Sequence, residues 1–158
     1  MQHDAQLRKQ LVDLLSSGEA HASFEKAIDS LPVAMRGKTP RGAEHSPWEL
    51  LEHIRIAQWD ILEFSRSAGH QSPGWPEGYW PKTAAPPSDI AWEQSVKTYR
   101  QDLTSMCDLI SDHKTDLYAK IPHGDSQTIL REALLLADHT AYHVGQLVLV
   151  RRLLDSWK

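Results

Sequence analysis

The sequence predicts an all-α protein folded as a four-helix bundle. Apolar residues recur at helical spacing along most of the chain, and runs with the alternation of a β-strand are scarce. Five of the nine prolines lie between residues 69 and 88, where they interrupt the helical patterns. Four long helices without strands bury their apolar faces by packing on one another. A chain of 158 residues has the size of one domain, so residues 1–158 are expected to form a single unit.

Two helical patterns lie in the N-terminal part. The first covers residues 4–17, with leucines on one face, and Gly18 follows as a stop signal. The second covers residues 20–30 and ends before a proline. Residues 32–45 contain prolines, glycines and charged residues, and they predict a connector.

The third predicted helix has the clearest start signal. Ser46 is expected to be the N-cap, Pro47 to occupy the first helical position, and Glu49 to reach back in a capping box. From there an inward-facing apolar pattern continues to about Arg66.

Two more helices are predicted, over residues 89–113 and 126–154. Ser88 is the expected cap of the first, and Asp125 or Ser126 that of the second. The segment of residues 69–88 that precedes them is long for a loop in a bundle, so we expect it to be packed. It is either a cover over one end of the bundle or a lid over a ligand cavity, whose walls would be the aromatic residues Trp75, Tyr79 and Trp80.

The most informative pattern is a pair of histidines in the last predicted helix. His139 and His143 are four residues apart, so on a helix both side chains lie on one face. They lie within a strongly apolar stretch, where imidazoles are costly to bury unless their nitrogens are paired or bound. A divalent metal would bind both rings in their neutral form. Core or interface histidines with polar partners are the alternative.

A reactive or tightly held metal needs a third ligand, and His53 is the best candidate. It stands beside the apolar face of the helix that begins after Ser46, and it can complete a three-histidine set if that helix packs against the last one. Three histidines leave coordination positions open for water or substrate.

Other polar residues have weaker claims to this site. His45 could line it, although a solvated connector histidine explains it as well, and Glu49 could approach the metal but already has its capping role. Gln146, about one turn after His143, could hydrogen-bond a ligand or a bound water. Asp60 is too far from His53 along its helix to share the ion. The remaining histidines are expected to face solvent: His3, His21, His70, His113 and His123.

These motifs resemble the DinB/YfiT-like superfamily. The resemblance rests on residues 50–54 (LLEHI) and on His139 and His143 at their four-residue spacing. Residues 44–48 (EHSPW) and 142–146 (YHVGQ) are similar to one bacterial branch of it.

The resemblance implies an up-down-down-up bundle, commonly homodimeric, with three histidines holding nickel, zinc or a similar divalent ion such as manganese or iron. Characterised members include transferases that use low-molecular-weight thiols and a mycothiol-dependent isomerase. The last predicted helix is apolar around much of its circumference, which also favours a homodimer.

Composition excludes several other classes. A net charge of −4 without a Lys/Arg cluster argues against nucleic-acid binding. No apolar stretch is long enough for a membrane span, and the N-terminus lacks the core of a signal peptide. The single cysteine, Cys107, is expected to be buried filler and fits a reducing cytoplasm. The resemblance to the DinB/YfiT-like superfamily implies metal-dependent thiol transfer to a small electrophile, which the residues alone do not distinguish from hydrolysis. A metal-dependent hydrolase, a non-catalytic binding protein and a structural dimer stay open.

Overall fold

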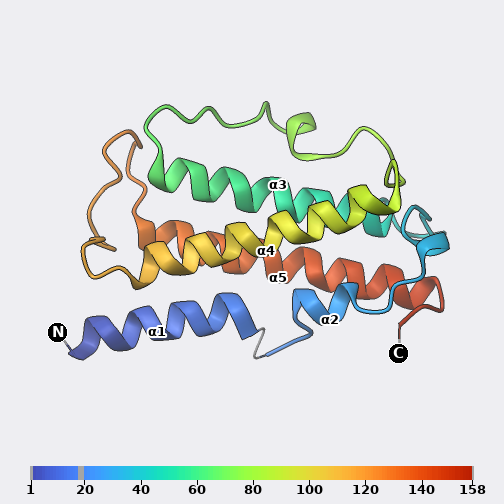
Figure 1. Ribbon diagram of the computed structural model, residues 1–158, viewed down its shortest axis with the longest axis horizontal. Coiled ribbons are helices and arrows are strands. Elements are labelled where there is room, and N and C mark those ends of the chain that lie inside the picture. The colour runs from blue at the N-terminus through green and yellow to red at the C-terminus, as the bar shows by residue number, and fades with distance from the viewer. Residues whose placement is uncertain (1, 18–19, 158) are drawn as a thin grey trace.

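The computed structural model describes residues 2–17 and 20–157. The regular elements of this part are helices, which are joined by loops (Figure 1). The predicted all-α class is therefore confirmed. Apart from one isolated bridge between Lys120 and Thr128, the described residues form no β-structure. The elements are α1 (Gln2–Ser17), α2 (Phe24–Ile28), η1 (Val33–Met35), α3 (Pro47–Arg66), η2 (Glu77–Tyr79), α4 (Asp89–Ser111) and α5 (Ile129–Leu153).

Helix α3 begins and ends where the sequence predicts. The Ser46 hydroxyl accepts a hydrogen bond from the Glu49 backbone N–H at 3.2 Å, and the Glu49 carboxylate accepts one from the Ser46 N–H at 2.8 Å. The capping box is complete, and the role of Glu49 is to hold the start of the helix.

Two of the predicted helical stretches are shorter than expected. Helix α5 starts at Ile129, because the Thr128 hydroxyl caps it and the Asp125 and Ser126 backbone N–H groups donate instead to the Gln127 side chain. The stretch predicted over residues 20–30 contains only the five residues of α2, which Ser23 caps.

The long helices pack against one another around two buried apolar clusters. Helix α3 contacts both α4 and α5, and α1 contacts α4 and α5 on the other side. One cluster is built mainly from α2, α3, α4 and the C-terminal half of α5, and the other includes α1 and the N-terminal half of α5. The segment that leaves α3 runs back along it, so α4 follows the same direction as α3 (Figure 1).

Two buried arginines close helix ends. The Arg8 guanidinium donates to the carbonyl groups of Ile110, Asp112 and Thr115 at the end of α4. Arg151 donates to the carbonyl groups of Ala27 and Asp29 at the end of α2. A helix C-terminus carries unpaired carbonyls and a partial negative charge, so a buried cation there satisfies both.

Candidate metal centre

The structure brings together the three histidines that the sequence predicts as metal ligands. His53 comes from α3, and His139 and His143 come from the facing side of α5. The Nε2 atom of His53 lies 3.0 Å from the Nε2 atoms of both His139 and His143. One ligand atom from each ring lies within 4.8 Å of the other two, which is the spacing of a metal-binding group.

Hydrogen bonds on the far side of two rings determine where their protons are. The Nδ1 atom of His53 lies 2.9 Å from the backbone oxygen of Tyr79, and the Nδ1 atom of His143 lies 2.8 Å from Oε1 of Gln146. Both oxygens can only accept, so in the neutral rings Nδ1 carries the hydrogen and Nε2 carries a lone pair. The two lone pairs then face each other across 3.0 Å, a contact that a shared cation would stabilise.

Burial keeps these imidazoles neutral. The pKa of His53 and of His139 is lowered to about 4, mainly by burial and in smaller part by the neighbouring imidazoles. The pKa of His143 is also lowered, mainly by burial. Histidine binds metal only when deprotonated, so at neutral pH all three rings are ready to bind without first releasing a proton.

The spacing of the rings also suits a metal of ordinary size. Imidazole nitrogens about 2.1 Å from one ion, at angles of about 90° to 110°, are about 3.0 to 3.4 Å apart. The separations of 3.0 Å from His53 Nε2 fall at the short end of this range. The Nδ1 atom of His139 is buried without a hydrogen-bond partner among the described residues, so this ring has a polar contact only through Nε2, which faces His53.

Trp80 covers the site from the segment between α3 and α4. Its ring stacks on His53 with a centroid distance of 3.9 Å and an interplanar angle of 3°. On its other side lies His45, also at 3.9 Å. Trp75, which was expected to form a wall of a ligand cavity, is instead 77% exposed, and its ring contacts Tyr79. Trp80 therefore occupies the space next to His53 where a cavity was expected.

Asp60 anchors this covering segment to α3. One carboxylate oxygen accepts a hydrogen bond from the Tyr79 hydroxyl at 2.6 Å, and the other lies 2.7 Å from Nε2 of His70. Burial and the nearby carboxylate raise the pKa of Tyr79 to about 12. The solvent-facing position predicted for His70 is wrong, since its side chain is only 8% exposed.

A hollow lies beside His45 and Gln146, and none of the three histidines is among its described lining residues. Its volume is about 260 Å³, and its walls include Leu50, Leu149 and Val150. Gln146 both lines this hollow and accepts the hydrogen bond from Nδ1 of His143.

Within the described residues, an all-helical fold brings together three neutral imidazoles, of which His53 and His143 are buried and His139 is half-buried, in a cluster that could hold a metal ion. Comparison with known families identifies the chain further. A family model described as the DinB superfamily matches residues 18–147, so the chain belongs to the DinB superfamily. The matched range contains all three histidines. Comparisons with curated proteins and with solved structures gave no match. Within the described part of the chain, no helix combines the length and apolar character of a membrane span.

Proposed function

We propose that this protein holds one divalent first-row metal ion through the Nε2 atoms of His53, His139 and His143. The observation that carries the proposal is the pair of opposed lone pairs on His53 and His143, which their Nδ1 hydrogen bonds impose. Nickel and zinc are the first choices, because imidazole suits both, and manganese or iron are the alternatives.

The proposed activity is transfer of a low-molecular-weight thiol to a small electrophile. A divalent ion lowers the pKa of a bound thiol or water, so that a nucleophile is available at neutral pH. Around it, the Tyr79 carbonyl and Gln146 orient two of the rings, and Trp80 keeps water from one face of His53. The hollow beside His45 would admit the electrophile.

The proposed assembly is a homodimer of up-down-down-up four-helix bundles in the cytoplasm. The directions of the helices in Figure 1 agree with this topology. Several large apolar residues of α5 are exposed, which supports a partner on this helix: Leu134, Tyr142, Leu149 and Leu153. Light scattering of a dimer should give twice the chain mass of 17.9 kDa, and the chain mass at micromolar concentration would refute it.

The metal site is tested by elemental analysis of protein purified without a histidine tag. We expect one metal ion per chain, and none in the variant with His53, His139 and His143 all replaced by alanine. The exposed His113 provides the matched control, since His113→Ala should keep the metal. Stoichiometric metal in the triple variant would refute the proposed ligands.

The activity is tested by loading the protein with nickel, zinc or manganese and adding monochlorobimane with several cellular thiols. Conjugation that disappears in His139→Ala and persists in His113→Ala would support the metal-centred mechanism. Equal conjugation in His139→Ala would refute it. A metal-loaded protein that turns over esters and no thiol would instead be the hydrolase alternative.

A further inference from the structure

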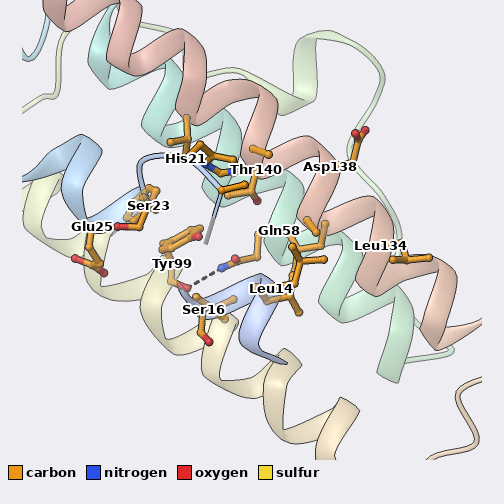
Figure 2. Close-up of a pocket in the computed structure, with 18 residues that line it drawn as sticks. Leu14, Ser16, His21, Ser23, Glu25, Gln58, Tyr99, Leu134, Asp138 and Thr140 are labelled. Carbon is orange, nitrogen blue, oxygen red and sulfur yellow. Dashed lines mark hydrogen bonds between the residues drawn. The ribbon is translucent and has the colours of Figure 1, made fainter. Parts of the chain in front are cut away.

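A second cavity lies on another face of α5 (Figure 2). It has a volume of about 460 Å³ and is enclosed by α5, the end of α1, the start of α2, and parts of α3 and α4. From α5 it is lined by Ala137, Thr140, Ala141 and Val144, whereas His139 and His143 are not among its lining residues. This volume is in the range of small-molecule sites.

The floor of this cavity contains an unused hydrogen-bond acceptor. Gln58 is fully buried, and its Nε2 donates to the Tyr99 backbone oxygen at 2.7 Å, as Figure 2 shows. That bond fixes the orientation of the amide, and Oε1 has no hydrogen-bond partner among the described residues. The Thr140 hydroxyl is also buried without a partner there. An unpaired buried polar group costs about 1–3 kcal/mol, so a ligand that pairs with it gains affinity.

The walls around these two groups are mainly apolar. They include Leu15, Phe24, Leu103 and Val144. Leu14 and Leu134, which also line the cavity, are 46% and 49% exposed, so the entrance of the cavity is apolar as well.

The charges of the lining select against anions. Glu25 and Asp138 both contribute to it. The Glu25 carboxylate is paired with Arg100 outside the cavity, and Asp138 is exposed. A carboxylate or phosphate on the ligand would approach negative charge, and the described lining residues include no lysine or arginine.

We propose that this cavity binds an uncharged, largely apolar molecule of about 10–17 non-hydrogen atoms that donates one O–H or N–H hydrogen bond to Gln58 Oε1. The ligand is an aromatic or branched alcohol, a phenol or an aromatic amine of this size, all of which are uncharged at neutral pH. The site is separate from the three histidines and does not depend on metal.

The proposal is tested by fluorescence with N-phenyl-1-naphthylamine, which is apolar and has one N–H donor. Its emission should rise on binding to the full-length protein. It should then be displaced by 2-naphthol, which has an O–H donor, at about tenfold lower concentration than by 2-methylnaphthalene, which has the same shape without a donor. The anion of 2-naphthoic acid should displace it least.

Substitutions assign the binding to this cavity. Ala137→Phe fills it with a ring and should abolish the rise in emission, whereas Ala5→Phe adds the same ring on the exposed side of α1 and should leave binding unchanged. Gln58→Met removes the acceptor and should abolish the preference for 2-naphthol over 2-methylnaphthalene. Thr140→Val removes only a hydroxyl, so it carries less risk to the fold, and it should reduce this preference.

Three results would overturn the proposal. The first is the absence of any rise in emission, as expected if a second copy of the chain covers the cavity. The second is unchanged binding in a folded Ala137→Phe variant, which would place the probe elsewhere. The third is equal displacement by 2-naphthol and 2-methylnaphthalene, which would remove the role of Gln58.

Discussion

The hydrogen bond from His143 to Gln146 controls which nitrogen of His143 can bind metal. Gln146 Oε1 accepts from Nδ1 at 2.8 Å, and Nε2 is left with the lone pair that faces His53. Leucine is similar in size to glutamine but has no acceptor, so in Gln146→Leu the proton can move to Nε2. Outer partners of metal-binding histidines typically contribute about 10- to 100-fold in affinity, or about 1.4–2.8 kcal/mol. We expect Gln146→Leu to weaken zinc binding by this factor.

Glutamate at the same position distinguishes the hydrogen bond from the shape of the side chain. A carboxylate accepts from Nδ1 at least as strongly as an amide, so Gln146→Glu should retain or increase the affinity. The assay is competition for zinc with a chromophoric chelator, using tag-free protein at neutral pH. Gln94→Leu, on the exposed side of α4, is the control for general effects of the substitution. The reasoning is refuted if Gln146→Leu binds zinc as tightly as the unchanged protein, or if Gln146→Glu binds as weakly as Gln146→Leu.

Arg8→Met removes the cation that donates to three carbonyl groups at the end of α4, and we expect a loss of about 3 kcal/mol in the free energy of unfolding. Thermal unfolding should show a midpoint about 6–12 °C lower, and an unchanged midpoint would contradict this role. Asp60→Asn weakens the acceptor for the Tyr79 hydroxyl, so limited proteolysis should cut residues 69–88 faster; equal rates would show that this contact does not hold the segment. Acidification should destabilise the metal-free protein. Burial lowers the pKa of His53 and His139 to about 4, whereas the unfolded chain takes up protons near 6.5, so their stabilising contribution is complete above about pH 6.5 and is lost as the pH falls toward 4. Urea unfolding should show the free energy of unfolding falling across this pH window. The fall should be smaller in the variant with His53 and His139 both replaced by alanine. An equal dependence of the free energy of unfolding on pH in both proteins would argue against these two rings as its source.

Local signals in the sequence were sufficient for some elements and not for others. The limits of α3 follow from a capping box whose partners are three residues apart, so short-range chemistry decides them. The start of α5 was predicted too early, because Asp125 and Ser126 resemble caps but their backbone N–H groups bond to the neighbouring Gln127 side chain.

In the candidate site, too, some residues could be predicted from local patterns and others could not. His53, His139 and His143 could be selected because helical spacing within an apolar stretch brings imidazoles to one face. The separate positions of Trp75 and Trp80 could not be predicted, since a proline-rich segment has no repeating pattern that shows which ring turns inward. The burial of His70 depends on Asp60, a partner on another element, and no local pattern encodes that contact.

The oxygen that orients His53 belongs to the backbone of Tyr79, not to its side chain. Substitution of one residue at a time will therefore not delete this acceptor, and a scan of side chains would overlook it. The only way to break the contact is to move the segment, for example by shortening it or by cutting its attachment at Asp60. Relatives could replace Tyr79 and keep this backbone acceptor only where other contacts, such as the one between His70 and Asp60, preserve the length and path of the segment without the Tyr79 hydroxyl.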